Sequence, residues 1–111
     1  LYEEIIFLKN FFKGKFIIEN VKPYYETLIK PDQIIERHIF WSNFDFPNIQ
    51  IPNISNFIKR SSTNEKKNLM DWLDIHYEKN IYYQNNHDPA QVLRNSVHPE
   101  IGNHIMDYAR N

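Results

Sequence analysis

Apolar residues recur at helical spacing in the first part of the chain. Leu1, Ile5, Leu8 and Phe12 lie three or four positions apart, which places them on one face of an α-helix. An acidic first turn and a Lys-Gly pair after the last apolar residue suit the two ends of a helix. The pattern therefore predicts a helix over residues 1–12, with this apolar face in the core.

The next apolar run is short and rich in β-forming residues. Residues 16–18 read Phe-Ile-Ile and predict a strand over 15–21 that is buried on both faces. A helix, a glycine turn and a strand make half of a βαβ unit. Glu19 and Asn20 come at the carboxyl end of this strand, where open α/β sheets bind ligands. The alternative is a strand that ends in a solvated turn.

A second strand is predicted over residues 33–44, which are rich in β-branched and aromatic residues. Glu36, Arg37 and His38 interrupt this apolar run in its middle. Charged residues in the middle of a strand either face solvent or point into a site, and both interpretations stay open.

Turn and capping residues define the other segments. Ser62 and Glu65 form a capping box that starts a helix, and Pro89 and Pro99 can each open one. The other predicted elements are a short helix over 24–30, irregular structure over 45–55 with a short edge strand at 49–51, a helix from 62 to about 77, a loop over 78–88, a short helix over 90–95 and a terminal helix over 99–108. The predicted fold class is α/β with a small mixed insert.

Composition narrows the class of protein. The chain has 111 residues, 41% of them hydrophobic, and a net charge of −1. It is long enough for one packed domain and is not a strongly basic nucleic-acid binder. It contains no Cys, which excludes disulfides, a thiolate metal site and a cysteine nucleophile within these residues.

The chain has no apolar run of the roughly 18 residues that a membrane span needs. We therefore expect a soluble intracellular protein with no membrane partner. The first residue is Leu1, inside a predicted helix, and we expect the chain to be a piece of a longer protein.

Few residues suggest chemistry when each is taken alone. The five His have no metal-ligand spacing and there is no glycine-rich phosphate loop, so no metal site is expected. Lys59 and Arg60 lie beside a Ser/Thr/Asn segment. They form either a solvated face or a loop that contacts DNA phosphates.

Three motifs occur in a fixed order along the chain. They are Glu-Asn-Val at 19–21, Arg-His-Ile-Phe-Trp-Ser-Asn at 37–43 and Arg-Asn-Ser-Val-His-Pro at 94–99. In this order the chain resembles the C-terminal part of DNA cytosine-5 methyltransferases, and the three segments are similar to the sixth, eighth and tenth motifs of that family. The resemblance implies the C-terminal portion of a Rossmann-like, S-adenosylmethionine-dependent methyltransferase sheet.

The resemblance also implies roles for individual residues. In this family the target cytosine is flipped out of the duplex, a cysteine thiolate adds to C6, and C5 takes the methyl group of S-adenosylmethionine. Glu19 is then the acid that hydrogen-bonds N3 and the exocyclic amine, and Asn20 holds the turn after it. Arg37 helps to position the nucleophile and the base, or contacts a backbone phosphate.

Further residues are assigned to the cofactor and to DNA. Asn95, Ser96 and Val97 line the S-adenosylmethionine pocket by this resemblance, and the missing N-terminal part binds most of that cofactor. Lys59 and Arg60 are the candidates for DNA contact. The expected partners are double-stranded DNA and the missing N-terminal half as a separate chain.

The chain departs from the family's pattern within two of the three motifs, and the arginine-rich ninth motif of the family is not recognisable. The eighth motif usually has Arg-x-Arg, and alignment on Phe40 puts Glu36 and His38 at these positions, with Arg37 between them. Either the register slips by one residue, which reverses the face on a strand, or the role has moved to Arg37 and His38. Arg94 stands where the tenth motif normally has Gly.

Three regions and a function are predicted. Residues 1–43 are the end of the catalytic α/β domain, 44–88 a short target-recognition-like insert, and 89–111 a C-terminal helix that returns to the catalytic domain. The predicted function is that of a fragment of a DNA cytosine-5 methyltransferase from a bacterial, cytoplasmic restriction-modification system, inactive alone because it lacks the nucleophilic Cys. The alternatives are a non-catalytic DNA- or partner-binding module derived from such an enzyme, and an unrelated α/β domain.

Overall fold

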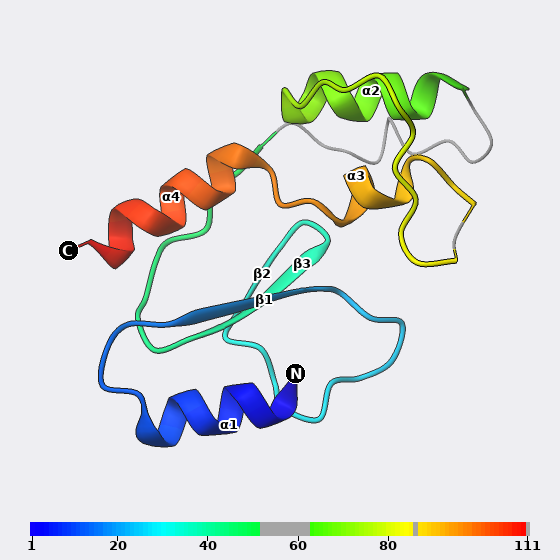
Figure 1. Ribbon diagram of the computed structural model, residues 1–111. Helices are drawn as coiled ribbons and strands as arrows, with labels where there is room; N and C mark the ends of the chain where they lie inside the picture. The colour runs from blue at the N-terminus through cyan, green and yellow to red at the C-terminus, as the bar shows by residue number, and fades with distance from the viewer. Residues whose placement is uncertain (52–62, 86, 111) are drawn as a thin grey trace. The chain divides into compact units, whose positions relative to one another are not determined.

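The computed structural model describes residues 1–51, 63–85 and 87–110 (Figure 1). They divide into two compact units. Leu1–Gln50 with Ile101–Asn111 form the first, which we name the sheet unit, and Ile51–Glu100 form the second, the helical unit. The described elements are α1 (Tyr2–Phe11), β1 (Ile17–Val21), β2 (Gln33–Ile35), β3 (His38–Ser42), α2 (Thr63–Leu73), α3 (Gln91–Asn95) and α4 (Pro99–Ala109). The fold is mixed α/β, as predicted.

The sheet unit contains a three-stranded sheet with the order β1-β3-β2, and both strand pairs are antiparallel. A two-residue turn, 36–37, joins β2 to β3, and Glu36 has a positive φ of 55°. The prediction of one strand over 33–44 is therefore wrong, because its charged middle is the turn of a hairpin. Two-residue hairpin turns favour Asn or Gly. Residues 36 and 37 are Glu and Arg, so the sequence gives no sign of the turn.

Antiparallel pairing determines which side chains share a face of the sheet. On one face, Trp41 packs against Ile5 of α1. On the opposite face, Phe40 packs against Phe46 with the ring centroids 6.1 Å apart. Phe46 in turn packs against His104 of α4. Helical residues therefore lie on both sides of the sheet.

The environment of β1 and the buried face of α1 both differ from the sequence prediction. β1 is half-buried and not buried on both faces, because it lies at one end of the sheet. Leu1 and Phe12 are exposed, whereas Ile5 is fully buried. The face of α1 that reaches the core is therefore narrower than the predicted stripe.

Residues 24–30 form no helix, contrary to prediction. The backbone N–H of Leu28 donates to the hydroxyl oxygen of Tyr2, 3.1 Å away, and so makes no helical bond. The predicted edge strand at 49–51 is also absent from the described residues, where two prolines bracket the segment.

The helical unit is built on α2 and α3. Leu69 and Leu73 of α2 form one buried cluster with Ala90 and Leu93. α2 ends at Leu73 and Asp74 follows with a φ of 55°. The prediction that this helix continues to about residue 77 is therefore wrong.

The two C-terminal helices agree with the sequence. α3 and α4 lie within one residue of the predicted segments 90–95 and 99–108. For α4 the agreement has a local cause. Pro99 occupies the first position of the helix, and Ile101 and Ile105 are buried on one face. No helix within the described residues is long and apolar enough to span a bilayer.

Candidate functional site

The strand register brings Glu19 of β1 next to His38 of β3. Glu19 is paired with Phe40, and His38 is paired with Val21, so Glu19 and His38 are diagonal neighbours on one face of the sheet. Nδ1 of His38 lies 2.7 Å from Oε1 of Glu19. The two residues are 19 positions apart in the sequence, and the pairing of β1 with β3 brings them together.

The Glu19–His38 pair lies partly inside the protein. The side chain of His38 is 5% exposed, whereas that of Glu19 is 33% exposed. With a proton on Nδ1, His38 donates a hydrogen bond to Oε1 and fixes the direction of the carboxyl group. No described residue bonds to Oε2 of Glu19. A carboxyl group held through one oxygen and open at the other can hydrogen-bond or protonate the polar edge of a ligand.

Asn20 and Arg37 do not join this pair. Asn20 is paired with Ile39, so its side chain is on the face opposite to Glu19. Arg37 lies in the turn that precedes β3. The sequence alone does not decide between Arg37 and His38 as the residue that acts beside Glu19. In the structure, His38 is the one that lies on a strand next to Glu19.

Asn95, Ser96 and Val97 lie in the helical unit, at the end of α3. The side-chain amide of Gln91 donates to Oδ1 of Asn95, and the hydroxyl of Ser96 donates to the carbonyl oxygen of Val92, both at 2.9 Å. All three candidate residues are half-buried. Local hydrogen bonds therefore orient two of the side chains, and part of each residue stays accessible to a ligand.

The remaining predicted residues give no described site. Lys59, Arg60 and the capping residue Ser62 lie outside the described residues. Within residues 1–51, 63–85 and 87–110, no three His, Asp or Glu side chains are grouped so that they could hold a metal ion.

Arg94 is the centre of a charged cluster that sequence reasoning misses. Its Nη1 binds the carboxylate of Glu65, and its Nη2 binds Asp88 and, at 2.9 Å, Oε1 of Gln91. Glu65 has a side chain that is only 3% exposed. Asp88 and Gln91 lie within six residues of Arg94 in the sequence, whereas Glu65 is 29 residues away and belongs to α2. The cluster therefore ties α2 to α3.

The charges of the Arg94 cluster shift two pKa values. The hydrogen bond from Arg94, aided by the backbone N–H of Ala90, lowers the pKa of Asp88. Burial acts to lower the pKa of Arg94, but the bonds to Asp88 and Glu65 outweigh it and raise that pKa. The ionised forms are therefore favoured in the folded state.

Asp88→Asn is expected to remove a pH-dependent part of the stability. A carboxyl group with a lowered pKa stabilises the fold above its unfolded pKa of about 3.9, and this contribution is lost as the pH falls through the folded pKa. The difference in free energy of unfolding between the wild type and Asp88→Asn should therefore be constant between pH 7 and about pH 5, and shrink below about pH 4. Urea unfolding at several pH values measures it. A difference that is equal at neutral and strongly acidic pH would contradict this expectation.

Comparison with known proteins assigns this chain to no family. The chain matches no protein-family model, no curated protein and no solved structure. The residues and their geometry are therefore the basis for inferring function.

Proposed function

We propose that the chain is part of a DNA cytosine-5 methyltransferase, which transfers a methyl group from S-adenosylmethionine to C5 of a flipped cytosine in duplex DNA. The contact between Glu19 and His38 carries this proposal. It joins the 19–21 segment to the 37–43 segment, two of the three segments that resemble this family. The contact therefore places two of the resembling segments together on one face of the sheet.

The arrangement of the sheet supports the same proposal. α1 packs on one face of the sheet, and on the other face Phe46 packs between Phe40 of β3 and His104 of α4. Doubly wound α/β sheets likewise have helices on both faces. Such sheets often carry antiparallel strands at one edge. In the proposed enzyme, β1, β3 and β2 are this edge of a Rossmann-like sheet. The outer edge of β1 has no strand partner among the described residues. We propose that the parallel strands of the N-terminal part of the enzyme pair with this edge.

Glu19 acts on the pyrimidine ring in the proposed reaction. When a thiolate adds to C6, electron density moves into the ring toward N3. The carboxyl group of Glu19 stabilises this charge by a hydrogen bond to N3, and its proton moves from Oε2 to N3 as the C6–S bond forms. His38 holds Oε1 and so directs Oε2 to the base.

The other components of the reaction lie partly outside this chain. The chain contains no Cys, so the nucleophile belongs to another segment of the enzyme. S-adenosylmethionine, when bound, supplies the methyl group. Asn95, Ser96 and Val97 are half-buried and locally hydrogen-bonded, which fits a contact along one side of the cofactor but not a complete pocket.

A methylation assay with labelled S-adenosylmethionine and duplex DNA tests the proposal. The chain alone should be inactive, and co-expression with the adjoining upstream reading frame, which supplies the Pro-Cys segment, should give activity. If no combination is active but salt-dependent DNA binding remains, the chain is a non-catalytic DNA-binding module. Loss of both activity and DNA binding would overturn the proposal.

His38→Leu is expected to reduce kcat of the complete enzyme by about 10²-fold, since a misplacement of about 1 Å costs this much. KM for DNA should change little, because His38 is 5% exposed and acts on the base through Glu19. His38→Arg should restore most of the rate, because a guanidinium also donates to a carboxylate. Steady-state kinetics measures both effects.

His76→Leu is the matched control for His38→Leu. His76 is exposed and contacts Asp74 in the helical unit, so its loss should leave kcat unchanged. Equal losses in His38→Leu and His38→Arg would show that His38 does not act by donating to Glu19.

A further inference from the structure

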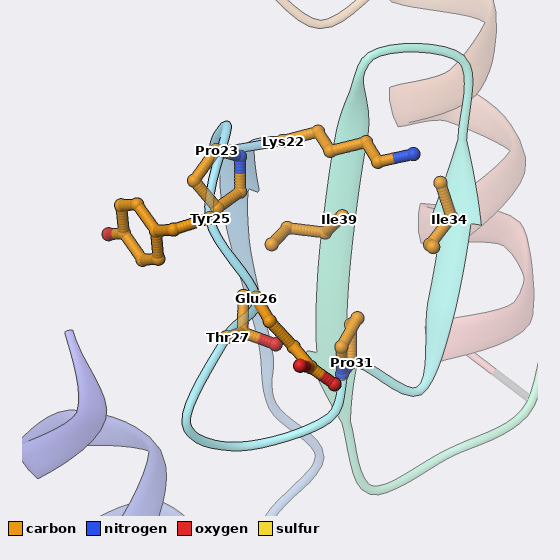
Figure 2. Close-up of a pocket in the computed structure, with 8 residues that line it drawn as sticks. All are labelled: Lys22, Pro23, Tyr25, Glu26, Thr27, Pro31, Ile34 and Ile39. Atoms are coloured by element: carbon orange, nitrogen blue, oxygen red, sulfur yellow. The ribbon is translucent and has the colours of Figure 1, made fainter.

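The segment between β1 and β2 forms one wall of an apolar pocket in the sheet unit. Figure 2 shows the side chains of Ile39 of β3 and Ile34 of β2 beside this segment, and Pro31 of the segment near its end. The cavity has a volume of about 180 Å³. Ile39 lies on the face opposite to Glu19, because adjacent strand residues alternate. The pocket is therefore separate from the Glu19–His38 site.

Hydrogen bonds fix this segment although much of its apolar surface is exposed. The indole N–H of Trp41 donates to the carbonyl oxygen of Ile29, and the backbone N–H of Leu28 donates to the hydroxyl oxygen of Tyr2, both at 3.1 Å. Yet Leu28 is 85% exposed and Tyr24 is fully exposed. Exposed apolar side chains on an ordered segment favour contact with a partner, and a segment that is already fixed loses little entropy on binding.

Two opposite charges lie at opposite ends of the pocket. In Figure 2 the amine of Lys22 extends across one end, and the carboxylate of Glu26 lies at the other end beside Pro31. Neither Lys22 nor Glu26 forms an ion pair with another residue in the part of the chain that the structure describes. A partner that places an acid opposite Lys22 and a base opposite Glu26 would form an ion pair with each of them.

We propose that this partner is a second copy of the same chain, bound face to face through a two-fold axis. An axis that lies in the interface and crosses the line from Lys22 to Glu26 at its midpoint and at a right angle places Lys22 against the partner's Glu26, and the reverse. Such an isologous interface needs a surface that is complementary to itself. An apolar floor between one positive and one negative end meets this requirement. The dimer forms on the face opposite to Glu19 and does not depend on the proposed function.

Charge reversal tests the dimer by sedimentation velocity on the full chain. The wild type should show a concentration-dependent species of twice the 13.5 kDa chain mass. Lys22→Glu and Glu26→Lys should each weaken dimerisation by at least about tenfold, because like charges then face each other twice. The double variant, Lys22→Glu with Glu26→Lys, should recover the dimer.

A mixture of the two single variants gives the most specific result. One copy then carries two acids and the other two bases, so both cross-pairs are attractive and a heterodimer should form. Glu78→Lys, an exposed reversal in the helical unit, should leave dimerisation unchanged. A wild type that stays monomeric, a dimer that tolerates both single reversals, or a mixture that stays monomeric would each overturn the proposal.

Discussion

Glu19→Gln is expected to lower methyl transfer by the proposed methyltransferase by about 10²- to 10³-fold, the usual effect of removing one group that stabilises transition-state charge. Glutamine has nearly the same shape and can still accept a hydrogen bond at its oxygen from Nδ1 of His38. It has no acidic proton to deliver to N3. Single-turnover transfer of a labelled methyl group measures the change without interference from product release.

DNA binding distinguishes lost chemistry from lost structure. Fluorescence anisotropy with a duplex should show nearly unchanged affinity for Glu19→Gln, because phosphate contacts supply most of the binding energy. Glu3→Gln is the matched control: Glu3 is an exposed acid in α1 and its change should have no effect on the rate. If Glu19→Gln retained the wild-type rate, the assignment of Glu19 as the acid would be wrong.

The Glu19–His38 contact could be predicted from the sequence only in part. The motif at 19–21 identifies the carboxylate, but its partner depends on strand register. A hairpin turn at 36–37 places His38 at the first position of β3. This turn has neither Gly nor Asn, so the local pattern resembles one continuous strand. The register that selects His38 over Arg37 is therefore a tertiary property.

Local signals succeed where one segment determines its own structure. Pro99 and the apolar stripe of Ile101, Ile105 and Tyr108 predict α4. They fail where contacts from distant segments decide. Residues 24–30 have helix-compatible composition, but the backbone N–H of Leu28 donates to Tyr2 and the indole of Trp41 donates to the carbonyl oxygen of Ile29. These bonds hold the backbone in another conformation. The two sides of the pocket in Figure 2 likewise come together only through the sheet.

Arg94→Met is expected to destabilise the helical unit by about 3–5 kcal/mol, because it leaves a buried carboxylate without its partner. Glu65 is almost completely buried and binds Arg94 directly. The chain has two Trp, and Trp72 lies in the helical unit whereas Trp41 lies in the sheet unit. Loss of the Trp72 indole N–H signal in a urea titration followed by NMR therefore reports the unit that the substitution affects.

A second substitution separates the buried charge from the packing. Glu65→Met combined with Arg94→Met should recover most of the lost stability, because replacing both members of a buried ion pair by apolar side chains is often neutral or stabilising. Arg110→Met is the exposed control. Arg110 pairs with Asp107 at the surface, and such pairs contribute about 0–1 kcal/mol. If the double variant were as unstable as Arg94→Met, the loss would come from the packing of the Arg94 side chain and not from the unpaired carboxylate. Recovery would mean that the fold needs Arg94 because α2 contributes Glu65, a buried acid that requires a partner.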